Sequence, residues 1–442
     1  MPSTFFGLNI ASSGLSAYQV ALNTTANNIA NVQTTGYSRQ QSNRVASDAL
    51  LVHQQYGAVG TGVTTVSVKQ IRNQYYDTKY WYNQSSVGLY ETKLSYLQQI
   101  ENYFIDDSSS KGFTTILNTM FNSLDTLKNN ASDVNTRQQF IGSAQNLATY
   151  FNSVSEGLTD IQTNDEIKST VQNINAIAEK IAVLNKQINV IEIQGGYANE
   201  LRDQRALLID ELSEIVPTEV SEVPITDTNH PDEPTGANYY TVKIGGQVLV
   251  DTYNYETLEC KARDYKVNQT DAAGLYDIKW SKTGNTFNAG GSSMSGTLKA
   301  LFDIRDGNNG ENFSGLAKVL NSTEVQITNP SITSIVGVSM PEEGILTING
   351  REYAYEGFTF EQDADGNITS YTFNMKRALT AEEQARVDGR TASVGTSIDA
   401  MGIPYYMSQM NQFLRSFATE FNNILKKGVD LDGNSTSGYA FF

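Results

Sequence analysis

Two short acidic runs contain residue types that bind calcium, namely DADGN at 363–367 and DLDGN at 430–434. An EF-hand loop supplies oxygen ligands at alternate positions and needs a glycine at its sixth position. Ile368 and Ser435 stand at that position instead. Both runs are therefore predicted to be turns, since Asp, Gly and Asn are turn-forming residues.

The remaining candidates for chemistry are one cysteine, Cys260, and two histidines, His53 and His230. A single cysteine excludes an internal disulfide, and the two histidines lack metal-ligand spacing. Cys260 alternates with Leu258 in a strand-like pattern, which favours a packed thiol over a nucleophile. Phosphate-binding GxxxxGK[ST] and hydrolase GxSxG motifs do not occur. We predict no catalytic residue, no metal site and no cofactor, and therefore no enzyme.

Composition narrows the possible partners. The 442 residues include 48 acidic and 31 basic side chains, giving a net charge of -17. This excess argues against nucleic-acid binding, which needs basic surface. The sequence contains no run of about 18 apolar residues, so no membrane-spanning helix is predicted. The first residues, MPSTFFGLNIASSGLS, lack a basic segment and a cleavage site, so they do not read as a cleaved signal peptide. If the protein leaves the cell, it uses a route that does not read such a signal.

The first segment has helical spacing but no charged residue before Arg39. Leucines and an isoleucine recur every seven residues, as in a coiled-coil seam, at Leu8, Leu15, Leu22 and Ile29. Gly7 and Gly14 precede two of these positions, and small residues let two backbones approach closely. We interpret the helix as a subunit interface that one chain cannot cover alone. An ordinary amphipathic helix packed in its own domain remains the alternative.

The helix is predicted to end near Asn31, before a turn at Gly36. Neutral amides satisfy buried polar groups without the cost of burying charge. We therefore expect Asn27, Asn28 and Asn31 to tie this elbow to neighbouring backbone and to belong to the interface.

These residues also carry a family resemblance. SGLSAYQVALNTTANNIANVQTTGYSRQ at 13–40 resembles the N-terminal signature of bacterial flagellar axial proteins. Its GYSRQ ending, NELRDQRALLIDELSEIV at 199–216 and SGTLKALFDIRDG at 295–307 resemble the flagellar hook-associated protein 1 family. In that family the chain continues to a C-terminal helix that pairs with the first one, so this sequence is expected to lack that segment.

Heptad-like apolar spacing predicts long helices from Ile71 onward. The stretch 133–194 is either one helix capped by Asp133 or two helices meeting near Asn164, with Gly195-Gly196 as the closing turn. Alternating patterns after Pro217 predict strands. The fold class is therefore α+β and multidomain, a long antiparallel helical bundle with β-rich outer domains.

We expect five regions. They are an axial helix at 1–34, a long-helix rod domain at 35–217 completed by helices at 293–314 and 404–428, β-rich domains at 218–292 and 315–403, and the start of an outer segment at 429–442.

Three charged residues lack an opposite charge three or four positions away on the predicted helix, namely Arg202, Asp203 and Arg205. They contact another helix or subunit, or they form a solvated face, which is the more usual place for charge. An aromatic group on an earlier helix is assigned to packing within the bundle or to an interface. It contains Tyr75, Tyr76, Tyr80, Trp81 and Tyr82.

The resemblance implies a structural protein of the extracellular flagellum, at the junction of hook and filament. Its implied partners are other copies of itself, hook protein, the second junction protein (hook-associated protein 3), and the flagellar export apparatus with a chaperone. The alternatives are a hook or rod protein of the same class, or a secreted enzyme on an axial scaffold. The enzyme alternative lacks any HExxH or nucleophile motif.

Overall fold

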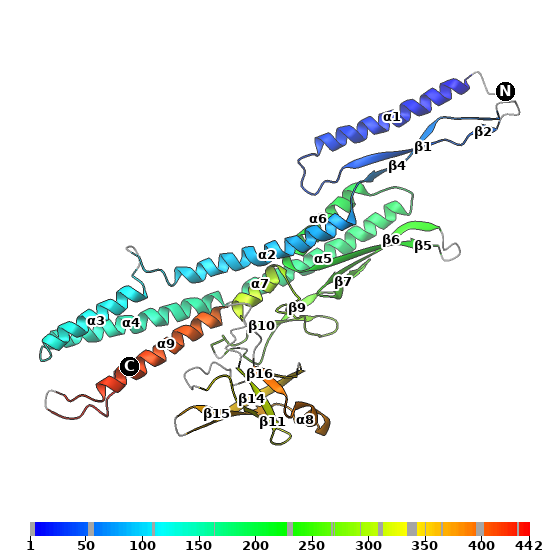
Figure 1. Ribbon diagram of the computed structural model, residues 1–442. Coiled ribbons are helices and arrows are strands. Elements are labelled where there is room, and N and C mark those ends of the chain that lie inside the picture. The colour runs from blue at the N-terminus through cyan, green and yellow to red at the C-terminus, as the bar shows by residue number, and fades with distance from the viewer. Residues whose placement is uncertain are drawn as a thin grey trace. The chain divides into compact units, whose positions relative to one another are not determined.

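The computed structural model describes residues 5–51, 57–107, 111–162, 164–227, 233–266, 268, 270–291, 293–307, 313–333, 343–349, 351–363, 366–394, 402–430 and 433–442. These residues combine long helices with several β-sheets (Figure 1), which confirms the α+β multidomain class. The contacts group the chain into two compact units. Unit 1 contains residues 1–90, 169–259 and 278–298, and unit 2 contains 91–168, 260–277 and 299–442.

Unit 1 begins with a helix lying along a two-stranded hairpin (Figure 1). Helix α1 is Phe6–Ala30, and strands β1 and β4 are Gln40–Ala46 and Val63–Gln70. The two strands are antiparallel, with a register shift between Asn43 and Arg44. The short strands β2, Leu50–Leu51, and β3, Ala58–Val59, pair between them.

The body of unit 1 is helical. It contains the first half of α2, Gln74–Asn102, most of α5, Asp165–Glu192, and all of α6, Asn199–Ile215. Residues of α5 at spacings of three and four are fully buried, among them Ile174, Ile177 and Ile181. The predicted turn is confirmed, since Gly195 has φ +83° and the Gly195 and Gly196 N–H groups close the end of α5.

A four-stranded sheet packs with these helices. Its order is β5-β6-β7-β8, formed by Thr218–Thr226, Pro234–Ile244, Gln247–Asp251 and Asn254–Tyr255. Gly245 and Gly246 have φ of +53° and +78°, the left-handed values that tight hairpins require, so the predicted hairpin is confirmed. Strands β9, Leu258–Ala262, and β10, Tyr276–Trp280, form a separate pair.

Three helices dominate unit 2 (Figure 1). They are α3, Phe113–Asn129, α4, Val134–Ile161, and α9, Ile403–Leu425. Their core buries Leu147 and Leu158. Asp133 caps α4 by accepting the Asn135 N–H, as expected.

The stretch 133–194 forms two helices rather than one. The break occurs at Asn164, whose side chain donates to the Gly274 carbonyl at 2.9 Å and accepts the Tyr276 N–H at 2.7 Å. These bonds replace the helical hydrogen bonds that a continuous helix would make there. The interpretation with two helices meeting near Asn164 is therefore the right one.

The expected helix at 293–314 is shorter. Helix α7 occupies Gly296–Arg305, and Phe313–Val319 is strand β11. Gly307 has φ +53°, a left-handed conformation that does not continue a right-handed helix. Helix α9 lies near its expected 404–428 range.

The remaining strands of unit 2 close into a barrel in the order β11-β12-β15-β14-β13-β16. Strands β12 to β16 are Glu324–Thr328, Gly344–Ile348, Arg351–Gln362, Ile368–Met375 and Thr391–Val394, and helix α8 is Ala381–Val387. Aromatic side chains fill the interior, with Phe313 5.6 Å from Phe373 and 4.7 Å from Tyr371, centroid to centroid. The five-region division of the chain stays a prediction.

Gly112 precedes helix α3 at its capping position and has no side chain to cap it, and Asp106 supplies the missing acceptor. Its carboxylate accepts the Gly112 N–H, the Thr115 N–H and the Thr115 hydroxyl at 2.7–3.0 Å. The hydrogen bonds from Thr115, followed by that from Gly112, lower the pKa of Asp106 to about 2.

We expect Asp106→Ala to lower the thermal midpoint of unfolding at neutral pH. The carboxylate stabilises the fold above its unfolded pKa of about 3.9, and this contribution disappears as the pH falls through about 2. Carbon-detected NMR titration measures the Asp106 pKa directly, and circular dichroism follows unfolding. Glu156→Ala, an exposed change on α4, is the control. An Asp106 pKa near 4 would contradict the capping role.

Candidate assembly surface

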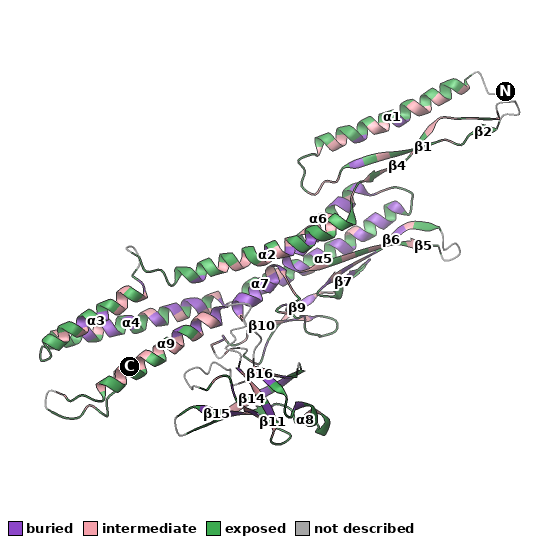
Figure 2. Cartoon of the chain, in the orientation of Figure 1, coloured by how far each residue is buried: buried purple, intermediate pink, exposed green. Residues whose placement is uncertain are grey.

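Helix α1 has two unlike faces. Ala17 and Thr24 are buried, on the side that packs against β1 and β4. The four seam residues, Leu8, Leu15, Leu22 and Ile29, are between 65% and 72% exposed. Figure 2 shows α1 almost entirely in the colours of exposed and intermediate residues. The described chain therefore covers one side of α1 and leaves the predicted seam open.

The two glycines of α1 also lie on open surface. A Cβ atom added at Gly7 or Gly14 would have no neighbouring atom of the described residues within 4 Å. Their small size is thus not needed for packing inside this chain. Their assignment to a subunit interface stays a prediction.

The elbow after α1 is held by asparagine side chains, as expected. Asn28 accepts the Gln40 N–H and donates to the Gln40 carbonyl, both at 2.8 Å. Tyr37 donates its hydroxyl to Asn28 at 2.9 Å, and Asn27 donates to the Tyr37 oxygen at 3.3 Å. Asn31 donates back to the carbonyl and side-chain oxygens of Asn27.

The first turns of α6 bind the same elbow. Asn199 donates to the Val68 carbonyl and accepts the Gln70 N–H, both at 2.9 Å. Asp203 accepts the Ser38 N–H at 3.1 Å. Burial raises the pKa of Asp203, while the Ser38 hydrogen bonds and the charge of Arg72 oppose that rise. Helix α6 therefore anchors both the elbow and strand β4.

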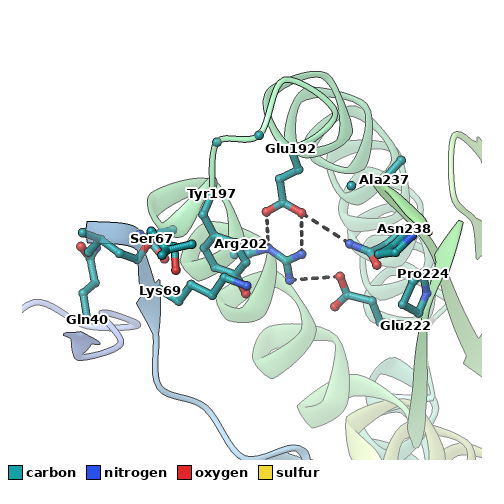
Figure 3. Close-up of a pocket in the computed structure, with 17 residues that line it drawn as sticks. Gln40, Ser67, Lys69, Glu192, Tyr197, Arg202, Glu222, Pro224, Ala237 and Asn238 are labelled. Atoms are coloured by element: carbon teal, nitrogen blue, oxygen red, sulfur yellow. Dashed lines mark hydrogen bonds and ion pairs between the residues drawn. The ribbon is translucent and has the colours of Figure 1, made fainter. Parts of the chain in front are cut away.

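An adjoining face of α6 carries a buried ion-pair cluster. Arg202 donates to both carboxylate oxygens of Glu192, at 2.6 and 2.7 Å, and its third nitrogen lies 3.0 Å from Glu222. Arg205 donates to Asn185 at 2.9 Å and lies 3.2 Å from Glu222. Figure 3 shows the bidentate pair between Arg202 and Glu192. This cluster joins α5, α6 and β5.

The expectation of a solvated face for Arg202, Asp203 and Arg205 is wrong, because all three are buried. Burial would lower the pKa of Arg202, but hydrogen bonds to Glu192 and the charge of Glu222 raise it, so the guanidinium stays charged. The sequence did carry a signal, since these residues lacked partners on their own helix. It could not identify the partners on α5 and β5.

The aromatic group on α2 is divided between core and surface. Trp81 is buried and donates its indole N–H to Asp210 at 2.8 Å. Tyr75, Tyr76, Tyr80 and Tyr82 are exposed. Packing within the unit therefore accounts for Trp81 and not for the tyrosines.

The other candidates offer little chemistry. Cys260 is half-buried and burial raises the pKa of its thiol, which disfavours the reactive thiolate. His53, His230, Asp365 and Asp432 lie outside the described residues. Within the described ranges, no cluster of three or more histidine, cysteine or acidic residues has metal-binding geometry. No helix in the described part of the chain is long and apolar enough to cross a membrane.

We expect Arg202→Ala to destabilise unit 1 by about 3–5 kcal/mol, because it leaves Glu192 buried without its ion partner. Chemical denaturation followed by far-ultraviolet circular dichroism, which reports on both units, measures the change. Arg386→Ala removes an exposed ion pair with Glu382 and should cost no more than about 0.5 kcal/mol. Equal effects of the two changes would contradict the role of the buried cluster.

Asn28→Ala should speed amide hydrogen exchange across residues 26–40, because three hydrogen bonds at the elbow are lost. Each such bond contributes about 1 kcal/mol. Asn23→Ala, an exposed change on the same helix, is the matched control and should leave exchange unaltered. Hydrogen–deuterium exchange with mass spectrometry measures both variants, and equal exchange would count against the elbow network.

Comparison with known proteins places these features in a family. The family model "Flagellar hook-associated protein FlgK helical domain" matches residues 97–329, and "Flagella basal body rod protein" matches residues 8–37. The chain is 40% identical over 228 residues to flagellar hook-associated protein 1 of Bacillus subtilis (strain 168), covering 50% of this chain and 45% of that protein. It is 40% identical over 223 residues to the Salmonella typhimurium protein of the same name, covering 48% and 39%.

The matched part thus spans less than half the length of these relatives. Among solved structures, the flagellar hook junction protein FlgK from Burkholderia pseudomallei aligns with a TM-score of 0.44 and 17% identity, over 73% of this chain and 62% of that one. Because the first family model covers more than half of the 442 residues, this chain belongs to the flagellar hook-associated protein FlgK family, a family of structural flagellar proteins.

Proposed function

We propose that this chain is a structural component of the bacterial flagellum, at the junction between hook and filament. The observation that carries the proposal is the chargeless face of α1, with four large apolar side chains exposed at seven-residue spacing. Monomeric proteins seldom leave such a stripe uncovered. The chain belongs to the FlgK family, and its relatives are named hook-associated protein 1. Both facts support the flagellar hook as the place where this stripe is covered.

In this proposal, burial of apolar side chains drives assembly. Burying what is exposed of Leu8, Leu15, Leu22 and Ile29 stabilises the assembly by about 4–8 kcal/mol per copy, before the entropic costs of association. Helix α1 itself contributes no charge to this surface, since only hydroxyls and amides lie beside its apolar seam. The nearby Arg44 of β1 has its guanidinium 5.2 Å from the centre of the Tyr18 ring. Gly7 and Gly14 allow another backbone to come close. Asn27, Asn28 and Asn31 hold the elbow that fixes the direction of α1.

The implied partners follow from this position. We propose contacts with other copies of the chain, with hook protein, and with hook-associated protein 3 as the second junction protein. Delivery to the extracellular flagellum would use the flagellar export apparatus and a chaperone, without a cleaved signal peptide. In this arrangement residues 1–34 form the inner layer, 35–217 the rod domain, and the β-rich regions 218–292 and 315–403 the outer surface, with 429–442 leading outward.

The proposal is tested on hooks isolated from Bacillus subtilis lacking its own hook-associated protein 1. We expect the purified, epitope-tagged chain to label hook tips in immunogold electron microscopy. Leu15→Asp with Leu22→Asp should reduce labelling at least tenfold, because assembly would then bury two carboxylates.

Leu316→Asp with Leu320→Asp introduces the same two carboxylates at exposed leucines, one on β11 and one just after it, and is the control. Circular dichroism of each variant verifies that it is folded. Equal labelling by the seam variant and the control would overturn the proposal, as would the absence of labelling by the unaltered chain.

A further inference from the structure

Helix α6 holds the arm of unit 1, which we define as α1, the elbow that follows it, and strands β1 and β4. Three polar side chains near the start of α6 make this joint. Asn199 binds the backbone of β4, Glu200 accepts an amide N–H of Gln40 at 3.1 Å, and Asp203 accepts the Ser38 N–H at 3.1 Å. Because each such bond contributes only about 1 kcal/mol, a change of charge at the joint decides whether the arm is held.

Asp203 is the unusual member of this joint. Its residue is 7% exposed, and its Oδ1 atom is buried without a hydrogen-bond partner among the described residues. The buried Glu192 of the same unit has Arg202 as its ion partner. No basic side chain in the described part of the chain lies within ion-pair distance of Asp203. An ionised Asp203 is therefore a charge removed from water without a cation beside it, which is costly.

The charged groups that face Asp203 do not remove this cost. Glu200 lies on the same helix and is acidic, and Tyr37 of the elbow contributes a neutral hydroxyl whose pKa burial and the two carboxylates raise. Arg72, at the end of β4, is the cation whose charge acts on Asp203. Its guanidinium donates instead to both carboxylate oxygens of Asp77 on α2, at 3.1 and 3.0 Å.

These contacts determine how the joint responds to pH. With the joint open, an aspartate has a pKa of about 3.9. Burial in the closed joint raises the pKa of Asp203 and the charge of Glu200 adds to the rise, while the Ser38 hydrogen bonds and Arg72 oppose it. The closed joint therefore binds a proton more tightly than the open one. Protonation stabilises the closed joint fully below about pH 3.9, and this stabilisation is lost as the pH rises through the raised pKa.

We propose that Asp203 is a proton-linked latch, which holds the arm weakly in the free chain at neutral pH and firmly when its carboxyl group is neutral. At neutral pH, closing the joint leaves the ionised Oδ1 buried and unpaired, so the arm opens often. Neighbouring subunits that cover the seam of α1 would supply the free energy that closes it. The latch itself is a property of the single chain and does not depend on the proposed function.

A competing explanation treats Asp203 as an ordinary acceptor for the Ser38 N–H. A charged acceptor binds an N–H group more strongly than a neutral one. Under that explanation, Asp203→Asn would weaken the joint. Under the proposal, the same change keeps an oxygen for Ser38 and removes the unpaired charge, so it strengthens the joint.

Hydrogen–deuterium exchange of the full chain at residues 36–41, corrected for the intrinsic pH dependence of exchange, measures how often the joint opens. We expect protection in the unaltered chain to rise about tenfold from about pH 7.5 to about pH 4, the factor given by one unit of pKa. Asp203→Asn should raise protection at neutral pH by a similar factor and remove the pH dependence. Glu211→Gln neutralises an exposed carboxylate on the same helix and should change nothing.

Two further measurements keep the result specific to the joint. Asp203→Ala removes the acceptor and should lower protection at residues 36–41. Exchange at residues 42–46 of β1 should be equal in all variants, which shows that the hairpin is intact. Protection at neutral pH that is unaltered or lower in Asp203→Asn, a pH dependence that persists in that variant, or no loss in Asp203→Ala overturns the proposal. Hook-tip labelling does not enter this test, so a failure of the proposed function leaves the latch to be decided by exchange.

Discussion

The bidentate pair between Arg202 and Glu192 fixes the arrangement on which the rest of unit 1 depends. Removing a guanidinium and a carboxylate from water costs several kcal/mol per ion, and the attraction offsets this only when the geometry is good. Arg202 meets the condition with Glu192 and Glu222, and Arg205 with Asn185 and Glu222. A shift of α6 by one residue would leave these charges buried and unpaired, so the cluster selects one register between α5, α6 and β5.

The same helix sets the position of the assembly surface. Asn199 and Asp203 hold β4 and the elbow, and the hairpin in turn supports α1. The buried ion-pair cluster and the exposed seam of α1 differ in charge. The cluster is charged, and its ion pairs are made among the described residues of unit 1, where Glu222 Oε1 has no hydrogen-bond partner. The four seam residues are uncharged and exposed, so burying them in an assembly would need no ionic partner.

Asparagine provides a recurring device in both units. Several helical or helix-end asparagines each bind a backbone carbonyl and a backbone N–H of another segment. Asn28 does so at Gln40, Asn175 at Leu258 and Asn189 at Asn238, while Asn199 and Asn164 each span two residues. One neutral side chain thus satisfies both groups that a strand or loop leaves open. This explains how helices rich in amides, which are middling helix formers, are stabilised by what they bind.

The sequence by itself determined the elements whose signals are local. Apolar spacing located the long helices, Gly245-Gly246 located a hairpin, and the absence of charge before Arg39 located the open seam of α1. Tertiary structure alone decided that Arg202 and Arg205 are buried, that the helical stretch is interrupted at Asn164, and that six strands close into a barrel. The physical reason is the same in each case. The partners that satisfy a buried charge, an interrupted helix or a strand edge lie on other elements, and only the packed fold brings them within hydrogen-bonding distance.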